Sequence, residues 1–276
     1  MALKPILFLG LFASLALSRA TSRQPVLCQV EAMSDELWAM AASAMANTTD
    51  FTAAAGETIT VPTYFHVIAK GRSLEEGYLT EEMMRGQLKQ LNADFAPTGF
   101  VFALEEINWT INADWAKYPG KPEVGRALRK GGYDSFNVYF ADIGEGGFAF
   151  YPRHTARGSA EFFLDGARIG YPATFGGTGM VFNQGKATSH EAGHWLFLQH
   201  TFENGCNAPG DDVADTPFQE KPILECDKPV KSCPNRNDLA PLFNHMGYGR
   251  DPCRSEFTPG QVDRMKRAWK VFREGK

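Results

Sequence analysis

Three of the chain's six histidines lie close together, beside a glutamate. His190 and His194 are four residues apart, so a helix places both imidazoles on one face, where they can share a metal ion. Glu191 follows the first histidine, a position from which a carboxylate reaches a water on the metal without binding the metal itself. His200 needs a turn after the helix to return to the same ion. Three nitrogen ligands and one open position are what catalytic zinc requires.

Two other interpretations of this stretch are open. A His-Glu-x-x-His match also arises by chance in helices, and the three histidines would then satisfy hydrogen bonds inside a core. Alternatively, an acidic residue such as Glu203 replaces His200 as the third ligand. The additional histidine at position 200 favours a metal site made of all three histidines.

The residues before the histidines alternate between strand and helix patterns. β-Branched and aromatic residues predict a strand over 59–68, in which Pro62 indicates an edge strand or a strand start. Thr80 and the acidic residues after it predict a capped amphipathic helix over 80–95. Other predicted strands are 100–104, 107–111, 136–140 and an edge strand around 148–152. The Gly-rich segment 166–181 lacks the spacing of a phosphate-binding loop and is interpreted as loop and strand bends.

The residues after the histidines are rich in proline and cysteine, which predicts irregular structure. A C-terminal helix follows, with Thr258 as its N-cap and Pro259 at its first position. Strands and helices thus alternate before the histidines, whereas irregular structure dominates after them. This difference predicts an upper part of α/β or α+β type, of which we favour α+β, and an irregular lower part around one cleft.

Length and charge restrict the class of protein. The chain has 276 residues, enough for one large domain or two small ones, and a net charge of -4 that gives no reason to expect nucleic acid or an anionic membrane as partner.

Lys4, the apolar run 6–17 and the small residues that follow predict a signal peptide over 1–20. No later stretch is long enough to span a bilayer. We expect a secreted, extracellular protein, and the sequons at Asn47 and Asn108 are compatible with glycosylation on that route.

Five cysteines in an exported chain are expected to form disulfide bonds. Four of them follow the histidines: Cys206, Cys226, Cys233 and Cys253. Four cysteines allow three pairings, which arithmetic alone does not distinguish. A reduced zinc site of four cysteines is the competing interpretation, which the signal peptide disfavours.

Residues 21–55 precede the first clear strand and are interpreted as an N-terminal extension or prosegment with a helical apolar pattern around Trp38 and Ala41. Cys28 within them has two interpretations. It is either a thiolate that binds the zinc and blocks its open position, or an unpaired or intermolecular cysteine.

Several further blocks of sequence accompany the histidines. They are Val61-Pro62-Thr63-Tyr64-Phe65-His66-Val67, Leu91-Asn92 with Ala96-Pro97-Thr98-Gly99-Phe100, Asn137-Val138-Tyr139, Asn183-Gln184-Gly185, Gly210-Asp211 with Ala214-Asp215-Thr216-Pro217, Asn244 to Tyr248, and Phe257-Thr258-Pro259-Gly260-Gln261. In these blocks and in the histidine stretch, over nearly all of 61–273, the chain resembles the metzincin zinc metallopeptidases. Among them it resembles the pappalysin family, particularly its secreted fungal members.

The resemblance implies a zinc endopeptidase that acts on protein or peptide substrates. The histidines at 190, 194 and 200 would bind zinc, and Glu191 would be the general base. Met246 would form the Met-turn beneath the metal, and Tyr248 would lie near the zinc to stabilise the tetrahedral intermediate. An edge strand around 148–152 would hold the substrate by strand addition.

The resemblance also implies a fold and its supports. Residues 56–276 would form one metzincin-like catalytic domain, expected to be monomeric, with a mixed twisted sheet, a backing helix and an active-site helix above the cleft. The lower subdomain would be stapled by Cys206–Cys233 and Cys226–Cys253 disulfides. Asp211, Asp212 and Asp215 resemble a region that binds structural calcium in the family, whereas acidic loop residues are often merely solvated.

The chain departs from the family motif at Phe197, where a glycine normally ends the helix and begins the turn to the third histidine. A bulky residue in a left-handed conformation costs about 1–2 kcal/mol. The alternative function is therefore a catalytically weak or silent secreted binding protein that retains the protease fold.

Overall fold

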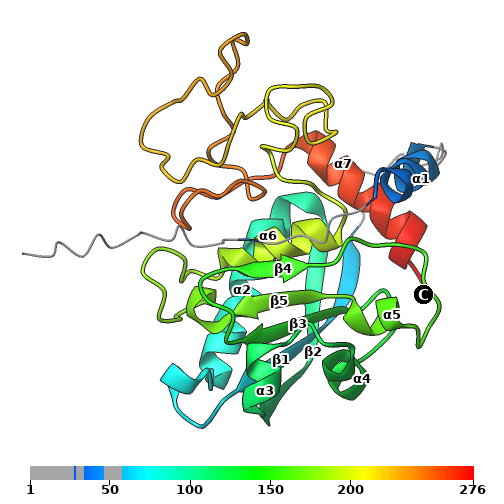
Figure 1. Cartoon of the computed structure of the whole chain (residues 1–276), viewed down its shortest axis with the longest axis vertical. Coiled ribbons are helices and arrows are strands. Elements are labelled where there is room, and N and C mark those ends of the chain that lie inside the picture. Colours follow the sequence, from blue (N-terminus) through cyan, green and yellow to red (C-terminus); the bar gives the residue numbers. More distant parts are fainter. Residues whose placement is uncertain (1–27, 29–33, 47–57) are drawn as a thin grey trace, which may run out of the picture.

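The structure is a computed structural model that describes Cys28, residues 34–46 and residues 58–276 (Figure 1). The predicted signal peptide 1–20 and the sequon at Asn47 lie outside the described residues.

Five strands form one mixed sheet in the order β2-β1-β3-β5-β4. They are β1 (Ile59–Ala69), β2 (Phe100–Ile111), β3 (Phe136–Ala141), β4 (Gly147–Ala149) and β5 (Ala167–Gly170). All neighbours are parallel except β4, which pairs antiparallel with β5 at the edge. The sheet confirms the mixed α+β prediction, but the strands predicted at 100–104 and 107–111 are one strand. A register shift opposite Thr63 and Tyr64 replaces the expected break.

Pro62 does not mark an edge strand, because β1 lies between β2 and β3. Its pairing with β3 begins one residue later, at Thr63, so Pro62 pairs only with β2. A proline is tolerated there because one side of the strand is still unpaired.

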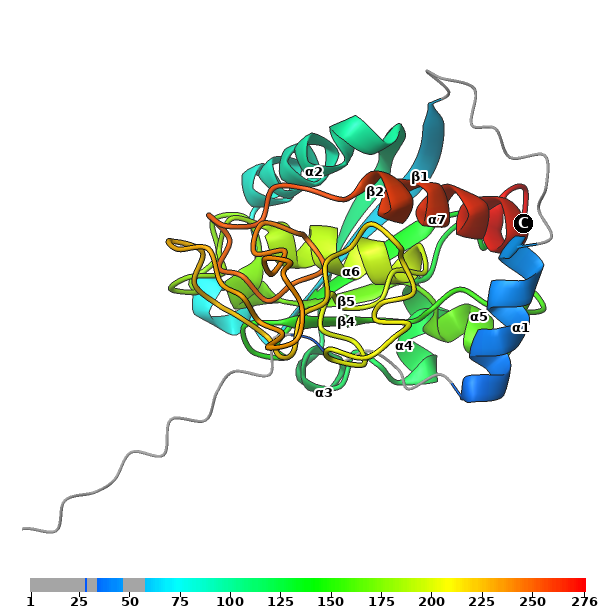
Figure 2. The same cartoon turned by 90° about the horizontal axis from the view of Figure 1, so that it is seen from above.

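Helices cover both faces of the sheet (Figures 1 and 2). The helices in the body of the chain are α2 (Glu81–Phe95), α3 (Ala113–Lys117), α4 (Pro122–Leu128), α5 (Ala160–Leu164) and α6 (Lys186–Trp195), with short 3₁₀ turns at Leu74–Glu76, Ala96–Thr98 and Tyr171–Ala173. Val67 and Phe140 belong to the main core with residues of α2 and α6, whereas Ile68 and Tyr139 pack with residues of α3 and α4. The sequence predicted α2 and α6 but missed α3, α4 and α5, which are too short for a periodic pattern.

The lower part is irregular, as predicted. Between His200 and Thr258 the described chain forms turns and one isolated bridge, and the disulfides Cys206–Cys233 and Cys226–Cys253 tie it together. This confirms the pairing implied by the resemblance. Disulfides here replace the stabilisation that a regular core would give.

Two terminal helices lie side by side (Figure 2). Helix α7 (Pro259–Ala268) starts with the predicted Thr258 cap, completed as a capping box by Gln261, and continues into a π turn at Trp269–Arg273. Helix α1 (Asp35–Ala46), in the predicted extension, packs against α7. None of the helices in the part of the chain that is described is long and apolar enough to cross a bilayer.

His66 gives the fold a dependence on pH. Its Nε2 donates to Asn137 Oδ1 at 2.9 Å and its Nδ1 accepts from Asn108 Nδ2 at 2.7 Å, which fixes a neutral tautomer. Burial lowers the pKa of His66 to about 4. Because the unfolded chain binds this proton more readily, stability is full above the ordinary pKa of about 6.5 and falls as the pH drops toward 4, by about 3 kcal/mol.

We expect denaturant unfolding between pH 7 and pH 4 to show this loss. The variant His66→Gln should have a flatter profile, because the other buried histidines titrate in both proteins and cancel in the comparison. Parallel profiles for the two proteins would contradict the assignment.

Candidate functional site

Helix α6 is held rigidly between the sheet and the lower part. Each of its residues from Ala187 to Trp195 is buried. Gln87 of α2 donates to Gly185 O at 2.9 Å, and Ser189 Oγ donates to Asp94 Oδ2 at 2.5 Å. These buried polar contacts fix the position of the helix that carries the first two histidines.

The chain turns at Phe197 in the conformation that the motif requires. Phe197 has a φ of 75°, in the left-handed region where glycine is expected. Its N–H donates to His194 O at 2.8 Å, and its carbonyl accepts from Arg264 Nε at 2.9 Å. The turn therefore delivers His200 to the other two histidines, and the bulky side chain does not displace it.

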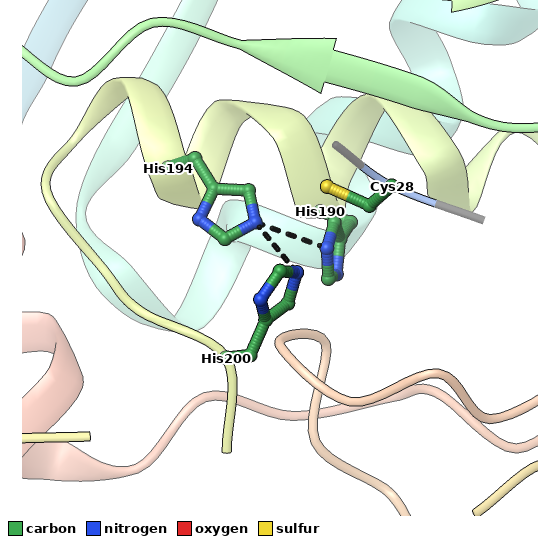
Figure 3. A group of neighbouring side chains, drawn as sticks. All are labelled: Cys28, His190, His194 and His200. Atoms are coloured by element: carbon green, nitrogen blue, oxygen red, sulfur yellow. Dashed lines mark hydrogen bonds between the residues drawn. The ribbon is translucent and has the colours of Figure 1, made fainter. Parts of the chain in front are cut away.

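The three histidine rings converge through their Nε2 atoms (Figure 3). His194 Nε2 lies 3.1 Å from His190 Nε2 and 3.2 Å from His200 Nε2. Tetrahedral zinc with Zn–N bonds of about 2.0–2.1 Å separates its nitrogen ligands by about 3.3 Å, so the set fits such an ion. The Nδ1 atoms of His190 and His194 contact the carbonyls of His245 and Leu198, both at 2.7 Å, which leaves Nε2 free for a metal.

Burial keeps all three histidines neutral, the form that binds metals. It lowers the pKa of His194 to about 4, and it lowers the pKa of His190 and of His200 well below the ordinary value. The neighbouring imidazoles lower the pKa of His190 and of His200 further.

Cys28 lies at the same point. Its sulfur and the three histidines place their ligand atoms within 4.8 Å of one another, and the cysteine is buried and forms no disulfide. The backbone of Cys28 forms a parallel bridge with Gly147 of β4, and its carbonyl accepts from Tyr248 Oη at 2.9 Å. Burial raises the pKa of the thiol well above its usual range, with the Glu191 charge as a second cause.

Glu191 faces the same space and is almost fully buried. Neither oxygen of its carboxyl group forms a hydrogen bond of normal geometry within the described residues, although the Cys28 thiol lies beside it. Burial raises the pKa of Glu191 to about 8. A Cβ on Gly147 would meet the Glu191 side chain at 2.8 Å, so β4 passes directly over this carboxyl group.

Met246 packs against the histidine helix at Gly193, and its place beneath a metal, which the resemblance implied, stays a prediction. A Cβ on Gly193 would meet its sulfur at 2.3 Å, so a larger residue there would force the methionine side chain to shift. Asn244 Oδ1 accepts from the Met246 N–H at 2.9 Å, which fixes the turn. The ring of Tyr248 packs against His200 with 5.1 Å between centroids.

The Phe197 side chain is buried in an aromatic cluster. Trp38 of α1 stacks on it with 4.5 Å between centroids, and Tyr151 and Phe272 pack around it. The Arg264 guanidinium lies 5.1 Å from the Phe197 ring and 5.0 Å from the Trp38 ring. The bulky residue at the turn is therefore a contact for the helix of the extension.

The other acidic residues considered as metal ligands do not join the group formed by the three histidines and Cys28. Glu203 is not part of the metal-ligating cluster found among the described residues, which leaves His200 as the third histidine of the set. Asp215 accepts from Thr258 Oγ1 and Gly260 N at the start of α7, and Asp212 pairs with Arg264. Asp211 is buried, and burial raises its pKa to about 7. None of these three carboxylates belongs to a metal-ligating cluster found among the described residues, and calcium in this region stays one of the two interpretations.

The sequence did not point to Arg254. This residue lines a pocket with His190, Glu191, Tyr248 and Phe182. It follows a cysteine in an irregular segment, where no periodicity or motif marks it.

Known proteins share both the sequence and the fold. The family model for pregnancy-associated plasma protein-A, Peptidase_M43, matches residues 132–270. An extracellular metalloprotease of Colletotrichum graminicola is 42% identical over 229 residues, covering 82% of each chain. Extracellular metalloprotease 1 of Coccidioides posadasii is 42% identical over 220 residues, covering 79% of each chain.

Two solved structures share the fold at low identity. Mature mirolysin of Tannerella forsythia, in complex with a cleaved peptide, has a TM-score of 0.62 at 24% identity and covers 76% of this chain and 91% of its own. Promirolysin from the same organism has a TM-score of 0.66 at 21% identity and covers 88% of this chain and 91% of its own. The sequence matches extend over most of the chain and of its relatives, so the protein belongs to the pappalysin family, Peptidase_M43, and is a metalloprotease.

Proposed function

We propose that the protein is a secreted zinc endopeptidase whose metal is held by His190, His194 and His200. The observation that carries this proposal is the convergence of three Nε2 atoms at 3.1 and 3.2 Å, with two of the opposite nitrogens occupied by carbonyls. Secretion is supported by the predicted signal peptide and by relatives named as extracellular enzymes.

Glu191 is the general base. A zinc ion supplies Lewis-acid activation of a water molecule and of the peptide carbonyl when bound. Glu191 takes the proton from the attacking water and delivers it to the leaving amine. Its position supports this role, because it is buried next to His190 and neither carboxyl oxygen has a hydrogen-bond partner of normal geometry within the described residues.

Tyr248 and β4 position the substrate. The Tyr248 hydroxyl already donates to a backbone carbonyl in the cleft, that of Cys28, and the same donation would stabilise the oxyanion that develops on a substrate carbonyl. The Cys28 backbone also bridges Gly147 on the edge strand. An extended substrate would add to β4 in the same way.

The extension 21–55 is a prosegment that keeps the catalytic domain 56–276 latent. The Cys28 sulfur lies with the three histidines, where a thiolate would take the open metal position. The match to promirolysin covers 88% of this chain and the match to mature mirolysin 76%, which supports an extension that belongs to a proform. Helix α1 adds a second contact at Phe197.

Zinc binding tests the ligand set. We expect the purified protein to contain one zinc ion and its peptide cleavage to stop on chelation. His200→Ala should weaken zinc affinity at least about tenfold because one of three ligands is lost. Glu203→Ala is the matched control and should leave it unchanged. An unchanged affinity in His200→Ala would refute the assignment.

The alternative of a silent binding protein is not favoured, because relatives are named as proteases and His200 reaches the other two histidines. A catalytic domain freed of the extension that is nearly inert, and that gains large activity on Phe197→Gly, would reverse this preference.

A further inference from the structure

Helix α1 completes a small apolar cluster to which the catalytic domain contributes only a part. The α1 members of this cluster are Trp38, Ala41 and Met45. The catalytic domain contributes five side chains, here called the Phe197 face: Tyr151, Phe197, Ala268, Val271 and Phe272. The cluster is separate from the main core between the sheet and α6. Without α1 the Phe197 face loses its cover, and an uncovered apolar face is a binding site for another segment of protein.

The α1 residues in the cluster have the spacing of a helix bound to a groove (Figure 2). Trp38, Ala41 and Met45 are three and four residues apart, so they lie on one face of the helix. Ala41 and Met45 are buried, whereas Ala39 and Ser43 are exposed. Side chains on one face of a helix bind by themselves, so this contact does not depend on the peptide link that joins α1 to β1.

The contact is centred on Phe197, whose backbone conformation suits glycine. Its φ of 75° is adopted by glycine without strain and by phenylalanine only at a cost. The Phe197 ring stacks on Trp38 with 4.5 Å between centroids and 11° between the planes. Arg264 contacts both rings and is fixed by donating to the Phe197 carbonyl and to Asp212. The strained residue therefore presents to the extension a ring that glycine would lack.

One part of this interface is packed less closely. A pocket lies where α1 meets α7, lined by Ala42 and Met45 of α1 and by Val213, Gly260 and Arg264 of the catalytic domain, among others. The attachment of α1 therefore depends mainly on the stacked Trp38 ring. An attachment that depends on a few side chains is reversible.

We propose that the extension stays bound through the Phe197 face after the chain between α1 and β1 has been cut, so that its release, and not the cut, activates the enzyme. This inference rests on the proposed role of 21–55 as a prosegment. Cys28 precedes α1 in the same fragment, and Gly147 and Tyr248 hold its backbone. A bound fragment thus keeps the thiol among the three histidines.

A full chain with a site for a sequence-specific protease inserted between α1 and β1 tests the proposal. Glu191→Gln is included to prevent further digestion, and Cys28→Ala leaves the thiol out of the attachment. After the cut, gel filtration at micromolar concentration should recover the extension with the catalytic domain. Trp38→Ala should weaken the affinity, measured by dilution, roughly 30-fold or more, as expected for an aromatic residue at the centre of an interface. Ser43→Ala, at an exposed position of the same helix, is the control.

Phe197→Gly removes the same contact from the other side and should weaken the affinity to a similar extent. The double variant should lose much less than the product of the two single effects, because both substitutions remove one stacked pair. Thermal unfolding before the cut checks that each variant folds.

Three binding results would overturn the proposal. They are complete separation of the fragments in the Cys28→Ala chain, an affinity that neither Trp38→Ala nor Phe197→Gly changes, and a catalytic domain that dimerises after the cut and no longer binds the extension.

Activity gives an independent test once Glu191 and Cys28 are restored. The cut parent should cleave peptides as slowly as the uncut chain until dilution releases the extension, whereas cut Trp38→Ala should be active at once. A cut parent that is active while the extension is still bound would show that release is not the activating step. If no variant cleaves peptides, the proposed function fails, and the binding results still decide whether α1 holds the extension.

Discussion

Replacing Glu191 with glutamine is expected to abolish most peptide hydrolysis while leaving the metal in place. Glutamine has nearly the same shape but cannot take a proton from water. General acid–base catalysis contributes about 10²–10⁴-fold to a rate, so kcat/KM on a broad peptide library should fall by about that factor. The fold should tolerate the change, because neither Glu191 oxygen has a hydrogen-bond partner of normal geometry to lose among the residues that the structure describes.

The metal content separates this role from that of a ligand. Glu191 does not belong to the metal-ligating group formed by Cys28 and the three histidines, so Glu191→Gln should bind as much zinc as the parent. His200→Ala should lose zinc and activity together. Activity of Glu191→Gln within tenfold of the parent would show that another group moves the proton.

Replacing Cys28 with alanine is expected to make the full-length chain active before any processing. The thiol lies with the three histidines in a buried position, and the alanine side chain has no atom that can bind the metal. The unprocessed parent should hydrolyse peptides roughly 100-fold more slowly than unprocessed Cys28→Ala. That ratio corresponds to a free-energy preference of about 2.8 kcal/mol for the state in which the Cys28 thiol blocks the metal position.

The second contact of the extension should have a smaller and different effect. Trp38→Ala removes the ring stacked on Phe197 but leaves the thiol in place, so the extension should be cleaved faster by an added protease while the intact chain stays latent. Ser43→Ala changes an exposed position of the same helix and serves as the control. Equal latency of Cys28→Ala and the parent would show that the cysteine does not block the metal.

The sequence by itself determined the chemistry of the site and the elements that carry it. His190 and His194 lie four apart on one helix face, a relation that depends only on helical geometry. The Thr258 cap of α7 and the long strand β1 were predictable because each rests on local pattern. The disulfide pairing followed from the family resemblance and is confirmed.

Only the tertiary structure decided the contacts made between distant segments. It brings Cys28 to histidines more than 160 residues later and places Arg254 beside Glu191, and neither relation leaves a periodic trace in the sequence. Phe197 is the clearest case. As a residue type it indicated a strained turn and a weakened site, because backbone preference is a local property. Its side chain, however, is buried against Trp38, Tyr151 and Phe272, and packing of that kind depends on how remote elements meet.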